Sequence, residues 1–225
     1  MKISFKHKFI FLSNPKCASS TMRGVLDPYV DYSSFDLSDR SDKYKALKMH
    51  MTAHEARLTW DDADEEFKEK YNWDEYYKFT TVRNPFKRLV SWYFMVLPDK
   101  NFKTIFEKDY NRDSGQLSNF NDWLKYSIEN NKIGLSNYRH MCCDPDTKEC
   151  LVDDVFKAEE INDVFPVKFE EKTGIKIDTP LPRIMPDRNT ENNSAYMRYK
   201  GNYYDLYNDE SIELVRAIYS ADLEE

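Results

Sequence analysis

Glycine is scarce in this chain, with 5 among 225 residues, and the glycine-rich pattern G-x-x-x-x-G-K-[ST] of a Walker A loop is absent. An excess of basic charge is also missing, because the formal net charge is −7. This balance argues against a nucleic-acid partner and against a surface built for long polyanions. Any anionic ligand must therefore be held by a local cluster of donors.

Long apolar runs are missing as well. After a basic N-terminal stretch, the run Phe9-Ile10-Phe11-Leu12 is far shorter than the core of a signal peptide or a membrane helix. The sequence therefore predicts neither an export signal nor a transmembrane segment.

Cysteine is present at four positions that form neither a zinc pattern nor a dense disulfide framework: Cys17, Cys142, Cys143 and Cys150. Reduced thiols in a cytosolic protein are the favoured interpretation. The alternative is a small loop closed between Cys142 or Cys143 and Cys150, which would imply an oxidising compartment.

The clearest local pattern is a strand, a loop and a helix at the start of the chain. Residues 8–13 predict a short buried strand, and residues 19–26 predict a helix that stops at Asp27-Pro28. Ser19 and Ser20 are the candidate N-cap residues of this helix.

A second unit of the same kind follows, with a strand at 76–82 that ends at Arg83 and an amphipathic helix at 86–97. Helices are further expected at 52–60, 61–70, 119–129, 159–173 and 203–222, and a strand at 150–157. This order of elements predicts an α/β protein with one domain over residues 1–225.

The first loop carries Pro15-Lys16-Cys17-Ala18-Ser19-Ser20-Thr21. The first N–H groups of a helix have no internal partner and the helix dipole favours negative charge, so such a loop suits an anion. Lys16 adds a positive charge and the hydroxyls add donors. The alternative is that the hydroxyls only cap the helix while Lys16 is solvated.

The second loop carries Val82-Arg83-Asn84-Pro85-Phe86-Lys87-Arg88-Leu89-Val90-Ser91-Trp92-Tyr93. A guanidinium at the strand end and a hydroxyl two helical turns later can together hold a second phosphate. Arg88 and Ser91 are spaced i,i+3 on one helix face. Two separate anion sites suit a nucleoside with a phosphate at each end.

These two segments resemble the cofactor signatures of carbohydrate sulfotransferases of the Golgi type, which use 3′-phosphoadenosine-5′-phosphosulfate (PAPS). The resemblance implies that Pro15, Lys16, Cys17, Ala18, Ser19, Ser20 and Thr21 bind the 5′-phosphosulfate, and that Arg83 and Ser91 bind the 3′-phosphate. Residues 151–159, with Lys157 where the family usually has Arg, and the stretches 193–194, 203–207 and 215–222 look like later parts of the same family. The implied fold is a P-loop-kinase-like three-layer sandwich with a central parallel sheet and helices on both sides.

The resemblance also suggests a catalytic pair. His50, in His50-Met51-Thr52-Ala53, matches a histidine that serves as general base in many relatives, and Lys16 is placed to stabilise the leaving phosphate. A structural His50, or a carboxylate such as Glu55 as the base, are the alternatives. No metal is expected, because His50 and His54 lack a third ligand at a convincing spacing.

The predicted activity is therefore transfer of a sulfuryl group from PAPS to a hydroxyl of a glycan acceptor, with PAP as product. A P-loop nucleotide kinase using Mg-ATP and a catalytically degenerate binder of PAP or sulfated ligands are the alternatives. Acceptor contacts are expected in the loops 31–48, 98–117 and 140–150. The absent anchor favours a bacterial or viral cytoplasmic enzyme over an excised Golgi-luminal domain.

Overall fold

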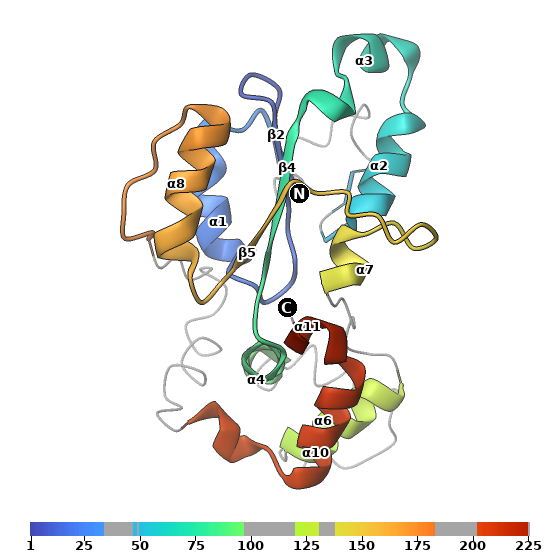
Figure 1. The fold of residues 1–225 in the computed structure, drawn as a ribbon, viewed down its shortest axis with the longest axis vertical. Coiled ribbons are helices and arrows are strands. Elements are labelled where there is room, and N and C mark those ends of the chain that lie inside the picture. The colour runs from blue at the N-terminus through green and yellow to red at the C-terminus, as the bar shows by residue number, and fades with distance from the viewer. Residues whose placement is uncertain (34–46, 49, 97–119, 131–137, 183–201, 225) are drawn as a thin grey trace. The chain divides into compact units, whose positions relative to one another are not determined.

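A computed structural model describes residues 1–33, 47–48, 50–96, 120–130, 138–182 and 202–224 (Figure 1). The chain divides into two compact units. The first comprises Met1–Arg83 and Ser136–Ile184, and the second comprises Asn84–Leu135 and Met185–Glu225. Whether they behave as the single domain expected from the sequence stays a prediction.

The first unit is built on a five-stranded sheet with the order β3-β1-β2-β4-β5. The strands are β1 (Lys2–Ser4), β2 (Phe9–Leu12), β3 (Tyr32–Ser33), β4 (Tyr77–Val82) and β5 (Asp154–Lys157). β2, β4 and β5 are parallel neighbours, whereas β1 pairs antiparallel with both β2 and β3. The sheet is thus mostly parallel, in agreement with the expected central parallel sheet, and the β1–β2 hairpin adds antiparallel pairing that the sequence pattern missed.

One face of this sheet is covered by α1 (Ser19–Leu26) and α8 (Ile161–Thr173) (Figure 1). Side chains alternate along a strand, and Phe9 and Phe11 of β2 point to this face, where both are fully buried. Their partners in the cluster include Met22, Val25, Leu26, Phe79, Phe156, Phe165 and Phe169.

The opposite face is covered by α2 (Ala53–Asp61), α3 (Glu65–Lys70) and α7 (Tyr138–Cys142). Ile10 and Leu12, the other two residues of β2, are buried here. The core on this side includes Ala53, Ala56, Trp60, Phe67, Trp73, Tyr76, Met141 and Cys142. The prediction of a sheet flanked by helices is therefore confirmed for the first unit.

Two helix starts in this layer are set by side-chain caps. Thr52 and Glu55 form a capping box at α2, and Asp64 Oδ1 accepts from the Phe67 N–H at 2.8 Å at α3. The helix expected at 61–70 therefore begins only at Glu65. Short 3₁₀ turns lie at η1 (Asp27–Tyr29) and η3 (Trp73–Glu75).

The second unit is helical in its described part, with α4 (Pro85–Val96), α6 (Phe120–Glu129), η5 (Tyr203–Leu206), α10 (Asp209–Ile218) and α11 (Ser220–Glu224). The single helix expected at 203–222 is wrong. It is divided because Asn208 forms a capping box with Ser211 and starts a new helix at Asp209. The core of this unit gathers aromatic side chains of α4 and α6 with Val215 and Tyr219.

Several predicted segments fall outside the described residues. The irregular segment 98–116 and most of the loop 31–45 belong to this group. In the ranges that are described, no helix is long and apolar enough to cross a bilayer.

Candidate functional site

The two predicted anion-binding segments leave the sheet at the same edge. β2 and β4 are parallel neighbours in which Leu12 pairs with Thr80, so their carboxyl ends lie side by side. After β2 the chain enters residues 13–18, called here the anion loop, and after β4 it reaches Arg83. Arg83 Nη1 donates a hydrogen bond of 3.3 Å to Lys16 O, which brings two predicted site residues together.

The anion loop turns its carbonyl oxygens toward the protein. Four consecutive carbonyls accept hydrogen bonds from side chains: Asn14 O from Ser19 Oγ, Pro15 O from Cys17 Sγ, Lys16 O from Arg83 Nη1 and Cys17 O from Thr81 Oγ1. Lys16 and Ala18 adopt φ of 64° and 61°, in the left-handed region. Left-handed residues that alternate with right-handed ones are typical of backbone nests, which concentrate N–H groups around an anion.

Helix α1 starts without a side-chain cap. Ala18 occupies the N-cap position, so the prediction that Ser19 or Ser20 caps the helix is wrong. The Ser19 hydroxyl is used elsewhere, in a bond of 2.5 Å to Asn14 O. Within the described residues, the backbone N–H groups of Ser19, Ser20 and Thr21 have no acceptor. Three open donors at the positive end of a helix are the arrangement that favours an anion.

The Lys16 ammonium group is largely buried and lies near a second cation, Arg83. Burial is the main cause that lowers its pKa from 10.5 to about 8, and the neighbouring Arg83 guanidinium lowers it further. In the described part of the chain, no carboxylate pairs with the Lys16 ammonium group. An anion bound at the loop would offset both the burial of this charge and its repulsion from Arg83.

His50 lies beside the start of the anion loop. Its Nδ1 is 2.7 Å from Ser13 O and 3.5 Å from Ser13 Oγ. Because a carbonyl oxygen can only accept, Nδ1 carries the proton in the neutral ring, and Nε2 is left as the acceptor. The residue is exposed, and α2 begins three residues later at a fixed capping box. This is the tautomer that a general base requires.

Glu55, the alternative base, is already engaged. Its Oε2 accepts the Thr52 N–H at 2.8 Å, while its own N–H donates to Thr52 Oγ1 at 3.1 Å. The carboxylate therefore acts in the helix cap, and this arrangement favours His50 as the base.

His54 is held by a different partner. Its Nδ1 is 3.0 Å from Asp144 Oδ2, and the other oxygen of Asp144 accepts the N–H groups of Asp146 and Thr147. These two backbone bonds are the main cause of the lowered pKa of Asp144. His50 and His54 thus have separate partners. In the described ranges, no group of three side chains could hold a metal ion.

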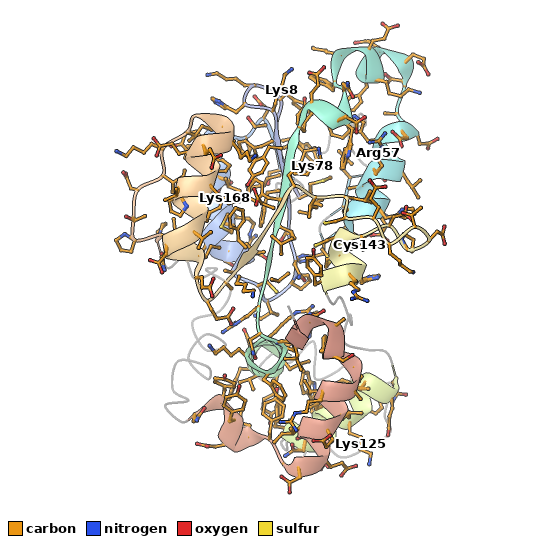
Figure 2. The ribbon with its side chains drawn as sticks, viewed as in Figure 1. Lys8, Arg57, Lys78, Lys125, Cys143 and Lys168 are labelled. Atoms are coloured by element: carbon orange, nitrogen blue, oxygen red, sulfur yellow. The ribbon has the colours of Figure 1, made fainter. Side chains whose placement is uncertain are left out.

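The cysteines are placed individually. Cys17 is fully buried, and its N–H donates to Asn14 O, so its observed contacts serve packing and loop closure. Cys143, labelled in Figure 2, follows α7 and lies opposite Cys150 in an antiparallel bridge. No disulfide joins any of the four cysteines. Of the two pairings left open by the sequence, only Cys143 faces Cys150, while Cys142 is buried in α7.

Ser91 belongs to the second unit. It lies half-buried on α4, where Arg88 is 3% exposed and packs over the Trp92 ring at 5.7 Å. Arg88 is therefore largely a packing residue of this unit. A joint site of Arg83 and Ser91 stays a prediction.

Sequence patterns missed several residues that shape the site. Asn14 and Thr81 organise the loop carbonyls, Ser13 orients His50, and Arg23 donates to Ser20 Oγ at 3.1 Å. Only the two that follow the first strand directly, Ser13 and Asn14, stood where a pattern could have drawn attention to them.

The first unit thus combines an uncapped helix start, a lysine in the preceding loop and the carboxyl end of a parallel strand, an arrangement typical of anion-binding sites. Comparison with known families then specifies the class. Residues 1–224 match the model described as "Sulfotransferase family", and the chain belongs to this family. No curated protein and no solved structure matches the chain.

Proposed function

We propose that this chain transfers a sulfuryl group from PAPS to a hydroxyl of a carbohydrate acceptor and releases PAP. The observation that carries the proposal is the anion loop together with the start of α1: the helix start offers three open backbone N–H groups, and Lys16 of the loop accepts a hydrogen bond from Arg83 at its carbonyl. Membership of the sulfotransferase family supports this donor over Mg-ATP. A P-loop-kinase-like sandwich remains the proposed fold type, on the same grounds.

The residues fit a donor with phosphates at both ends. The N–H groups of Ser19, Ser20 and Thr21 suit the oxygens at the 5′ end, and the Arg83 guanidinium suits the 3′-phosphate together with Ser91. When bound, PAPS supplies the sulfuryl group that moves to the acceptor.

The chemistry assigned to the chain concerns one proton and one developing charge. His50 Nε2 takes the proton of the acceptor hydroxyl while the acceptor oxygen forms its bond to sulfur. Lys16 stabilises the negative charge that grows on the 5′-phosphate oxygen as its bond to sulfur breaks. His50, which precedes α2, contacts the start of the anion loop at Ser13. Lys16 is a residue of the loop itself.

The test is transfer of labelled sulfate from PAPS to a panel of glycans, with purified wild-type protein and His50→Ala. Wild-type protein should label at least one glycan, and His50→Ala should lower turnover by about 10²- to 10⁴-fold. His7→Ala is the matched control, because His7 lies in the turn at the opposite end of β2 and stacks edge-on with Tyr29. Near-normal turnover of His50→Ala on the true acceptor would contradict the base assignment.

A comparison of ligands separates this function from the kinase alternative. PAP should raise the melting temperature of the protein, and Mg-ATP at the same concentration should not. Stabilisation by Mg-ATP alone would favour a kinase.

A further inference from the structure

Two neighbouring hydroxyls at the start of α1 have opposite hydrogen-bond roles. Ser19 Oγ donates to Asn14 O at 2.5 Å, and because a carbonyl can only accept, the Ser19 hydroxyl hydrogen is committed to the loop. Ser20 Oγ accepts from Arg23 Nη2 at 3.1 Å, and a guanidinium can only donate. The hydrogen of the Ser20 hydroxyl has no acceptor among the described residues.

The Arg23 side chain folds back over the first turn of its own helix. Its Nε donates to Ser19 O at 3.4 Å while Nη2 reaches Ser20 Oγ. A positive charge near a helix N-terminus is normally unfavourable, and Lys16 and Arg83 already place two cations at this edge.

We infer that Arg23 is a positioning residue that fixes Ser20 as a directional donor to the anion held at the start of α1. The inference rests on the proposed function, in which this anion is the 5′ end of PAPS or PAP. By accepting from Arg23, the Ser20 oxygen turns its own hydrogen away from the guanidinium and toward the open N–H groups of the first turn. The Ser19 hydroxyl donates to Asn14 O within the loop and therefore does not share this role.

The experiment is a calorimetric titration of the full chain with two ligands. PAP carries both phosphates, and adenosine 3′-phosphate lacks the 5′-phosphate. Ser20→Ala and Arg23→Met should each weaken PAP binding by about tenfold or more, the range of one charge-assisted hydrogen bond. Neither change should alter the affinity for adenosine 3′-phosphate, which would show that the fold and the 3′ site are intact.

Double variants test whether Ser20 and Arg23 act on PAP binding through the same hydrogen bond. Ser20→Ala/Arg23→Met should bind PAP about as well as the weaker single variant, because both changes remove the same donor. Ser19→Ala/Arg23→Met should show additive losses, because Arg23 Nε donates to the backbone oxygen of Ser19 while the Ser19 hydroxyl donates to Asn14 O. Arg23→Lys should recover part of the lost affinity. Arg216→Met, which removes an exposed arginine paired with Glu213 on α10, is the control and should change nothing.

The outcomes separate the two proposals. If wild-type protein does not bind PAP, the proposed function fails and the role of Arg23 fails with it. If wild-type protein binds PAP but the Ser20 and Arg23 losses are additive, or if both ligands weaken equally, the positioning role is overturned and the proposed function stands.

Discussion

The two helices that follow the parallel strands β2 and β4 begin in different ways. Helix α1 starts after left-handed Ala18 with no side-chain cap and with open N–H groups. Helix α4 starts with Pro85, which has no N–H group, and Asn84 Oδ1 accepts the Lys87 N–H at 3.3 Å. The cap of the second helix therefore takes up the Lys87 N–H, and Pro85 has no N–H to offer.

This difference teaches that similar strand-loop-helix patterns can bind anions by different means. At the first, main-chain N–H groups and the helix dipole do most of the binding, supplemented by Lys16. At the second, Pro85 and the Asn84 cap reduce the number of main-chain donors, and the Arg83 side chain lies next to the anion loop. Side-chain truncation should therefore affect the two ends of the donor differently.

The largest expected effect is on catalysis at the first loop. Lys16→Met should lower turnover by about 10²- to 10³-fold, because it removes a cation next to the charge that develops on the leaving phosphate. Affinity for PAP should fall much less, because the backbone donors remain. Steady-state kinetics and calorimetry on the same preparation measure both. A loss confined to affinity would show that Lys16 only binds.

The next effect is on binding at the second loop. Arg83→Met should weaken PAP by about 10- to 100-fold, because no main-chain donor replaces the guanidinium. Binding of AMP, which lacks the 3′-phosphate, should change little. An equal loss for both nucleotides would mean that Arg83 acts mainly through its bond to Lys16 O and not on the 3′-phosphate.

A pH series sharpens the role of Lys16. Its pKa is lowered to about 8, so the ammonium is charged below that pH and neutral above it. PAP affinity should be level below pH 8 and fall as pH rises through it, while Lys16→Met should lack this fall. The contribution of Lys16 to folding stability changes with pH in the opposite direction to the affinity for PAP. Between pH 8 and 10.5 the unfolded chain binds more protons, so the Lys16 contribution to the free energy of unfolding rises with pH.

The smallest effects concern the helix starts themselves. Asn84→Ala should lower the free energy of unfolding by about 1 kcal/mol, the usual value of an N-cap. Ala18→Gly should raise it by up to about 1 kcal/mol, because glycine adopts φ of 61° without strain. Ala56→Gly, inside α2, is the matched control and should lower it. Denaturant unfolding measures the free energy of unfolding of all three variants. A decrease for Ala18→Gly would contradict backbone strain at Ala18.

The sequence predicted the first strand, loop and helix well, because an apolar run between polar residues and a Pro stop are local signals. The end of the helix expected at 159–173 was also correct, because α8 ends at Thr173 and is followed by Gly174 with a φ of 71°. Strand β1 was missed because Lys2 signals a surface, yet it is 2% exposed and paired with Asp27 and Ser33. Such long-range pairs leave no local trace.

The prediction of the candidate site from sequence was limited in the same way, by contacts between distant residues. Residue types and order predicted two separate anion sites at Lys16 and Arg83, but not the hydrogen bond that joins Arg83 Nη1 to Lys16 O. The cap position was wrong because Ser19 is already the first residue of the helix, and its hydroxyl donates back to Asn14 O. The contact of His54 with Asp144 joins residues 90 positions apart, and no pattern within one sequence reveals it.

The most direct test is a calorimetric titration of wild-type protein with PAP, AMP and adenosine 3′-phosphate in the presence of a chelator. The account predicts that PAP binds at least tenfold more tightly than either monophosphate, because the anion loop and Arg83 each hold one end. Equal affinity for PAP and AMP would contradict a second phosphate site at Arg83. No binding of PAP at all would contradict the proposed function.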